Sequence, residues 1–113
     1  MVGAGALGCE FVKSYALMGI GCSPHGMVTC TDNDNIEVSN LNRQFLFRQN
    51  NVGKPKSRTA LEIGATMNKD FRCRALQEYV SPDTEHIFND QFWNSLSFVV
   101  NAVDNIKARQ YVD

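Results

Sequence analysis

The sequence predicts an α/β fold with a doubly wound, mainly parallel sheet and helices on both of its faces. Three observations predict it. Glycines 3, 5 and 8 have the G-x-G-x-x-G spacing of a tight strand-to-helix turn. Apolar segments of strand length alternate with segments of helical periodicity. Two of those strands end in an acid, Asp32 and Asp104, and ligands of such sheets bind beyond the carboxyl ends of the strands.

The first half of the chain predicts a helix, a strand and a second helix. After Gly8, apolar residues recur at steps of three and four: Phe11, Val12, Tyr15, Ala16 and Met18. The segment 19–26 (GIGCSPHG) ends this helix, and 27–32 (MVTCTD) is short and β-branched, as is typical of a buried strand. A polar loop follows. Pro55 suits the first turn of the next helix, which carries on one face Ala60, Leu61, Gly64 and Ala65.

The second half predicts two further strands and a last helix. Residues 71–79 show a weak strand pattern, 97–104 (SFVVNAVD) an apolar strand and 105–113 the start of a helix. Between the strands, short helical turns place four residues in the core: Phe88, Phe92, Trp93 and Leu96. With right-handed crossovers, this order gives a Rossmann-like sheet. Only two residues precede Gly3, and the chain stops in a helix. We therefore expect a sheet truncated at both ends, with residues 1–113 forming the N-terminal part of a larger domain.

Composition excludes several classes of function. The chain has 113 residues, of which 43% are hydrophobic, and a net charge of −1, so no general basic field favours nucleic acid or a membrane surface. No apolar run approaches the ~20 residues of a membrane span, and the opening lacks the features of a signal peptide. The four cysteines form no C-x-x-C pair. We expect a cytoplasmic and nuclear protein with no nucleic-acid and no membrane partner.

The glycine turn and Asp32 indicate a nucleotide site. Gly3, Gly5 and Gly8 let a phosphate approach bare backbone amides where strand turns into helix. Asp32 ends the following strand, where a carboxylate accepts hydrogen bonds from both ribose hydroxyls and repels a 2′-phosphate, which disfavours NADP. On these residues alone, an NAD-dependent oxidoreductase and an ATP-using enzyme fit equally well.

The loop after Asp32 separates these two classes. The segment 39–48 (SNLNRQFLFR) supplies Asn40, Arg43 and Gln44, and Lys56 opens the next helix. The pyrophosphate of NAD does not react, so hydride transfer needs no cations around it. Attack at a phosphorus of ATP does need them, because charge must be neutralised on the phosphoryl group and on the departing pyrophosphate. The alternative is that these side chains are ordinary solvated surface charges.

Two carboxylates are candidate ligands of Mg²⁺. Asp104 ends the last predicted strand, and Asp34 lies two residues beyond Asp32; both offer the hard oxygen atoms that this ion prefers. Asp104 also stands directly before a helical run, where an acid can serve as the N-cap. The segment 32–37 (DNDNIE) is not a calcium loop, because Ile36 and Glu37 stand where an oxygen ligand and a glycine are required.

Four segments together resemble the ATP-binding half of the ubiquitin-activating enzymes, relatives of the bacterial adenylyltransferases that prepare sulfur-carrier proteins. They are 2–10 (VGAGALGCE), 31–47 (TDNDNIEVSNLNRQFLF), 52–57 (VGKPKS) and 99–113 (VVNAVDNIKARQYVD). The resemblance covers nearly the whole chain, and SNLNRQFLFR is highly specific. The segments 19–26 and 82–96 are more similar to the large single-chain activator of ubiquitin than to the activators of its smaller relatives.

The resemblance implies an ATP- and Mg²⁺-dependent enzyme that adenylates the C-terminal carboxylate of ubiquitin and releases pyrophosphate. A cysteine outside this chain then takes the acyl group as a thioester. Arg43 and Lys56 would ease the negative charge as the bond to pyrophosphate breaks, and Asp104 would bind Mg²⁺ with help from Asp34. The nucleotide-binding positions carried over are Gly3, Gly5, Ala6, Gly8, Asp32, Asn40, Arg43, Gln44 and Lys56.

The resemblance also implies partners. The family builds its active half against an inactive, related half in the same parent chain, and an arginine of that half reaches the phosphates, so residues 1–113 alone should be nearly inert. Ubiquitin is the expected substrate, and ubiquitin-conjugating enzymes are expected to bind through other domains. The alternatives are the nucleotide-binding domain of an NAD-dependent oxidoreductase, an activator of another ubiquitin-like modifier, and a non-catalytic module like the inactive half, which would have lost the charged residues.

Overall fold

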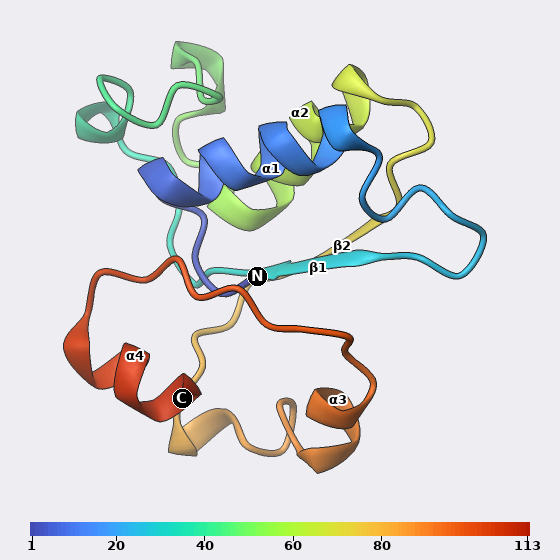
Figure 1. Ribbon diagram of the computed structural model, residues 1–113. Helices are drawn as coiled ribbons and strands as arrows, with labels where there is room; N and C mark the ends of the chain where they lie inside the picture. Colours follow the sequence, from blue (N-terminus) through green and yellow to red (C-terminus); the bar gives the residue numbers. More distant parts are fainter.

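The computed structural model describes residues 1–113 and has a parallel sheet between two layers of helices (Figure 1). Strand β1 (Val28–Thr31) pairs in parallel with β2 (Cys73–Leu76). Val2 forms parallel bridges to Thr31 on one side and to Asn101 on the other. The spatial order is therefore residue 101, residue 2, β1, β2. β1 and β2 lie on one side of residue 2 and the last segment lies on the other, so the strand order switches beside the glycine turn. The predicted doubly wound α/β class is confirmed.

Helices α1 (Ala6–Met18) and α2 (Lys56–Met67) cover one face of the sheet and pack against each other. Their contact surface is apolar and includes Val12 and Leu61, with Phe71 from the segment before β2. At Gly64, an added Cβ would lie 2.9 Å from Val12 Cγ1, so this glycine sets how closely the two helices approach. Pro55 immediately precedes α2 as its N-cap residue, close to the predicted first turn.

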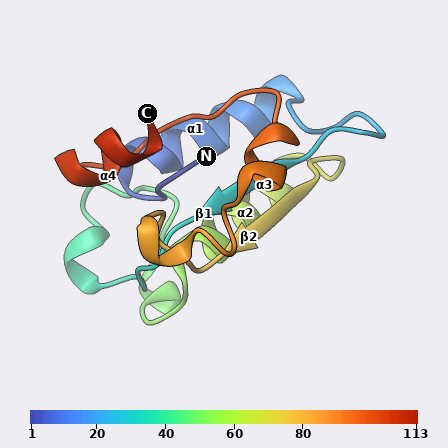
Figure 2. The same ribbon diagram turned by 90° about the horizontal axis from the view of Figure 1, so that it is seen from below.

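The opposite face carries α3 (Asp90–Asn94), α4 (Ile106–Val112) and a 3-10 turn, η3 (Pro82–Thr84), as the view from below shows (Figure 2). A smaller apolar cluster centres on Val2, Val80 and Phe88. Of the four predicted core residues in this region, Phe88 is buried, whereas Phe92, Trp93 and Leu96 are half-buried. The Trp93 indole N–H donates to the Phe88 carbonyl at 2.9 Å.

The polar loop between β1 and α2 is ordered by two 3-10 turns, η1 (Val38–Asn40) and η2 (Gln49–Asn51). Three of its apolar residues, Ile36, Leu46 and Phe47, are buried in the main core. The Arg48 guanidinium donates to the carbonyls of Phe45 and Phe47. The loop is therefore held by the core and by its own turns.

The structure differs from the expectation at three places. The segment 97–104 makes one bridge, at Asn101, because only Met1 and Val2 lie beside it; Val2 N–H donates to Val100 O at 2.8 Å and Ala102 N–H to Val2 O at 2.7 Å. Met18, expected on the apolar face of α1, is 71% exposed. The N-cap of α4 is Asn105, not Asp104. No helix has the length and apolar character needed to cross a membrane.

Candidate functional site

A cleft of about 770 Å³ lies where the strands reach their carboxyl ends. Its walls are the glycine turn, the loop after β1, the segment after β2 and the start of α4. Most of the predicted site residues line it, namely Gly3, Gly5, Ala6, Asp32, Asp34, Arg43, Gln44, Lys56 and Asp104. Side chains far apart in the sequence thus meet at one edge of the sheet, where the fold class predicts a ligand.

The three glycines of the turn differ in what a side chain at each position would meet. Gly3 has φ +101°, and a Cβ there would lie 2.6 Å from Ala102 O. A Cβ at Gly8 would lie 2.6 Å from Gly3 O, so Gly8 is required by packing beneath the turn and does not line the cleft. At Gly5 the nearest atom, Gln44 Nε2, would be 3.9 Å away. Gly5 is therefore open, and it precedes the first turn of α1, where no side chain caps the backbone amides.

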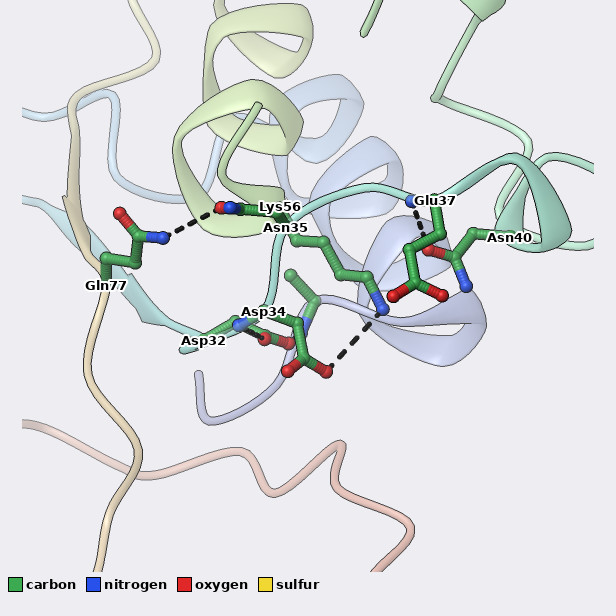
Figure 3. Close-up of polar contacts among 8 residues, drawn as sticks. Asp32, Asp34, Asn35, Glu37, Asn40, Lys56 and Gln77 are labelled. Atoms are coloured by element: carbon green, nitrogen blue, oxygen red, sulfur yellow. Dashed lines mark hydrogen bonds and ion pairs between the residues drawn. The ribbon is translucent and has the colours of Figure 1, made fainter. Parts of the chain in front are cut away.

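Asp32 is tied to the glycine turn. Its Oδ2 accepts the Ala4 N–H at 2.7 Å. Its Oδ1 accepts the Asp34 N–H at 2.8 Å (Figure 3). An ionised carboxylate oxygen has two lone pairs, so each oxygen retains one for a ligand hydroxyl. The two backbone bonds fix the orientation of the carboxylate at the edge of the cleft.

Lys56 brings a positive charge to the cleft on a side chain that is largely buried. Its side chain is 10% exposed, and Nζ lies 3.8 Å from Oδ2 of Asp34, whose side chain is 62% exposed (Figure 3). The Lys56 backbone N–H also donates to the Asp34 carbonyl at 3.0 Å. Because Lys56 is the first residue of α2, the start of the helix determines where this positive charge lies.

Arg43 and Gln44 reach the cleft from the loop between η1 and η2. Arg43 is exposed, and its guanidinium donates to the Ser39 carbonyl at 3.3 Å and to Asn42 Oδ1 at 3.4 Å. Gln44 is buried, and its Oε1 has no hydrogen-bond partner. Arg43 therefore brings an exposed cation to the cleft, and Gln44 brings a buried side-chain amide.

Asn40, which the resemblance gives as a nucleotide-binding position, lies outside the cleft, as Gly8 does. It is buried, it does not line the cleft, and its Oδ1 accepts the Glu37 N–H at 2.8 Å, which closes η1 (Figure 3). A short polar side chain in a turn often satisfies its own backbone in this way. In this structure Asn40 shapes the loop that carries Arg43 and Gln44.

Several residues that line the cleft were not predicted, and the clearest are Asn105, Lys107 and Arg109 around the start of α4. Asn105 accepts the N–H groups of Lys107 and Ala108, and Arg109 Nε donates to Val103 O at 2.7 Å. A usable signal was present. In a doubly wound sheet, the first turn of the helix after each strand faces the ligand edge. The same rule that places the cations after Asp32 at the cleft therefore also predicts those after Asp104.

The cysteines offer no nucleophile near the cleft. All four are free. Burial raises the pKa of Cys9 to about 11 and that of Cys30 to about 12, and the reactive form of cysteine is the thiolate. The thiols of Cys9 and Cys30 therefore remain protonated and unreactive at neutral pH, as expected of small apolar residues in the core.

The fold and the cleft together define a Rossmann-like domain with a polar, mixed-charge ligand site. The chain belongs to the ThiF family, whose sequence model matches residues 1–113. It is 57% identical over its whole length to "Ubiquitin-activating enzyme E1 1" of Triticum aestivum and 50% identical to "Ubiquitin-like modifier-activating enzyme 1" of Homo sapiens, and it spans 11% of the length of each.

A solved structure has the same fold. The tRNA N6-threonylcarbamoyladenosine dehydratase TcdA of E. coli, in complex with ATP, superimposes with a TM-score of 0.77 and 29% sequence identity. The match covers 93% of this chain and 40% of that one. The likeness therefore extends over nearly all of this chain.

Proposed function

We propose that residues 1–113 are the N-terminal part of the ATP-binding adenylation domain of a ubiquitin-activating enzyme. Ubiquitin's C-terminal carboxylate would be adenylated in this domain, with release of pyrophosphate. The observation that carries the proposal is the meeting of Asp32, Arg43, Lys56 and Asp104 in one cleft around an open glycine turn. The relatives that are 50–57% identical over the whole chain and carry the name of this activity support it.

ATP is the nucleotide that this arrangement favours. Asp32 presents one free lone pair on each oxygen to the two ribose hydroxyls. The 5′ end of the ribose then points toward Gly5 and the uncapped start of α1, where backbone amides attract phosphate. The relative TcdA, solved with ATP, has the same fold over these elements, which supports carrying the nucleotide over to this chain.

The cations have a defined part in the reaction. An oxygen of the ubiquitin carboxylate attacks the α-phosphorus, the bond from that phosphorus to the bridging oxygen breaks, and pyrophosphate leaves with the electron pair. Lys56 and Arg43 would lie against the oxygens that gain negative charge. The Lys56 side chain is largely buried and reaches the cleft, and a cation already held in place neutralises developing charge without the reorganisation that water would need.

The carboxylates of Asp34 and Asp104 suit Mg²⁺. Both line the cleft and both are exposed, and the chain has no group of three or more His, Cys, Asp or Glu side chains that could hold a metal ion by itself. A site with one or two carboxylates, completed by phosphate and water oxygens, is what Mg²⁺ prefers. When bound, the ion would neutralise charge on the triphosphate. Asp34 would exchange its contact with Lys56 for this ligand role.

Other parts of the proposal concern residues outside this chain. We propose that the parent protein also contains the thioester-forming cysteine, an inactive related half and the domains that bind conjugating enzymes. The length of the relatives supports a larger parent protein. Whether the modifier is ubiquitin or a related protein depends on those regions, and the relatives' names favour ubiquitin.

The decisive experiment is ATP–pyrophosphate exchange by the intact parent protein with and without ubiquitin. We expect exchange only with ubiquitin present, and a loss of about 100-fold or more in the Asp104→Ala variant, because metal-assisted neutralisation of phosphate charge is worth several kcal/mol. The matched control is Asp70→Ala, an exposed acid outside the cleft, which should retain normal exchange. Normal exchange by Asp104→Ala would remove its proposed role, and tighter binding of NAD than of ATP would favour the oxidoreductase alternative.

A further inference from the structure

The carbonyl oxygen at the end of β2 is shared by two elements that carry site residues. Leu76 O accepts the Asp32 N–H at 3.1 Å and the Ser57 hydroxyl at 2.8 Å. A carbonyl oxygen has two lone pairs, so these two bonds use its full capacity. The segment that carries Asp32 and the start of the helix that carries Lys56 therefore meet at one atom.

Ser57 is the side chain through which α2 reaches this atom. It is 1% exposed and does not line the cleft. The N-cap residue of α2 is Pro55, and no side chain caps the amides of the first turn. The hydroxyl of Ser57 thus bonds to the sheet and not to its own helix. A buried hydroxyl that is satisfied in this way ties the start of the helix to the end of the strand.

Two hydrogen bonds join the first turn of α2 to the rest of the protein. One is the bond from Ser57 to Leu76 O, and the other runs from the Lys56 N–H to Asp34 O at 3.0 Å. Asp34 lies in the exposed segment 33–35, whereas Leu76 belongs to a strand that is paired with β1. Of the two partners, Leu76 is therefore the firmer anchor.

From this arrangement we propose that Ser57 is a positioning residue for Lys56. Its bond to Leu76 sets where the first turn of α2 lies, and the Lys56 side chain extends from the adjacent position to the cleft. The inference deepens the proposed function and rests on it, because in that function Lys56 neutralises charge that develops as pyrophosphate leaves. Such a contribution depends on position, since a displacement of about 1 Å can cost about 100-fold in rate.

The test uses ubiquitin-dependent ATP–pyrophosphate exchange by the intact parent protein. Ser57→Ala removes the hydroxyl, and Ser57→Cys fills the same space with a group that is only a weak donor. Thr66→Ala is the matched control: it removes a hydroxyl from the last turn of the same helix, which donates to Ile63 O at 2.6 Å outside the cleft. Each substitution is also made in the Lys56→Ala background. Circular dichroism and thermal unfolding verify folding, and if Ser57→Ala is unstable, Ser57→Cys decides the outcome.

We expect both Ser57 variants to lower the maximal exchange rate by about tenfold and to leave the KM for ATP within about twofold, because a contribution made in the transition state appears in the rate constant. With Lys56→Ala already present, neither variant should change the rate by more than about twofold, since a residue that acts through Lys56 then has nothing to position. Thr66→Ala should match its parent in both backgrounds.

A second measurement does not depend on activity. Reductive methylation of the lysines is followed residue by residue with mass spectrometry. Lys56 should react about two- to tenfold faster in the Ser57 variants than in wild type, the change in local opening that the loss of one hydrogen bond gives. Lys54 is the internal reference, because it is exposed and lies outside the cleft, and it should react equally in all variants.

The inference is overturned if exchange by both Ser57 variants stays within about twofold of wild type, if their loss persists undiminished in the Lys56→Ala background, or if Lys56 reacts no faster than in wild type. The proposed function fails separately. In that case wild type would show no ubiquitin-dependent exchange, and the methylation of Lys56 would still decide whether Ser57 holds it in place.

Discussion

Lys56 and Asp34 form an ion pair whose two members are buried to very different extents: Nζ lies 3.8 Å from Oδ2, while the lysine side chain is 10% exposed and the aspartate side chain 62%. The separation is at the long end for an ion pair, and the exposed carboxylate loses little by moving into water. The lysine side chain has less freedom to move, because most of it is buried. The pair therefore contributes little to stability, and in the proposed function its lysine is the cation that meets a negatively charged ligand.

The first prediction follows from this asymmetry. In the intact protein, Lys56→Ala should lower ubiquitin-dependent ATP–pyrophosphate exchange by about 100-fold or more, because a cation held in place at the phosphates stabilises the transition state strongly. Unfolding should change by only ~0–1 kcal/mol from the loss of the pair itself, since its partner is exposed. Lys54→Ala is the control, because Lys54 is exposed and does not line the cleft. Exchange near the wild-type rate in Lys56→Ala would contradict the proposed role.

The three glycines of the turn should separate stability from binding. Gly3→Ala and Gly8→Ala each place a Cβ 2.6 Å from a backbone oxygen, and Gly3 adds a strained φ of +101°, a backbone cost of order 1–3 kcal/mol. Both variants should unfold at lower temperature. Gly5→Ala meets nothing closer than 3.9 Å, so it should fold normally and bind ATP more weakly, because its methyl group occupies the phosphate side of the turn. A Gly5→Ala protein with unchanged ATP affinity would place the phosphates elsewhere.

Much of this architecture could be predicted because it depends on local patterns. The glycine spacing, the β-branched run before Asp32 and the helical periodicity after Pro55 are short-range signals, and β1, α1 and α2 lie close to where those signals place them. The segment 97–104 was predicted less well. Its residues are strand formers, but pairing requires a neighbour, and only Val2 forms a bridge to it.

In the site, too, the sequence could predict which residues meet but not the bonds that their side chains form. Five residues could be assigned to one cleft, because the carboxyl ends of the strands in a doubly wound sheet lie along the same edge. They are Asp32, Asp34, Arg43, Lys56 and Asp104. The side-chain bonds were not predictable. Asn40 satisfies the Glu37 N–H and Asn105, not Asp104, caps α4, and each result depends on side-chain distances that sequence spacing does not fix. The isolated Oε1 of Gln44 is a property of three-dimensional packing and has no sequence signature.

The buried thiols predict a distinctive pH profile. Burial raises the pKa of Cys9 from 9.0 to about 11, so the folded protein favours the neutral thiol. The resulting stabilisation is fully present below pH 9 and is lost as the pH rises through about 11. Alkylation by iodoacetamide, followed residue by residue with mass spectrometry, should accelerate about tenfold per pH unit from 9 to 11 at Cys9 in the folded protein. In the urea-unfolded chain the same cysteine should level off above pH 9, and identical profiles in the two states would contradict the effect of burial.

The last prediction concerns the bond between Asp32 and the glycine turn. Asp32→Asn keeps the shape of the side chain but offers a single acceptor oxygen, so it can satisfy either the Ala4 N–H or the Asp34 N–H, not both. The orphaned amide should destabilise the domain by about 1–3 kcal/mol. The same change weakens the grip on the ribose. Wild type should therefore bind ATP more tightly than 2′-deoxy-ATP, by about tenfold for one hydrogen bond to a charged group. In Asp32→Asn this preference should fall to about two- to threefold, the value for a neutral acceptor. Because the preference is a ratio measured within one variant, general destabilisation cancels from it. A ratio unchanged by the substitution would show that the ribose is held by some other residue.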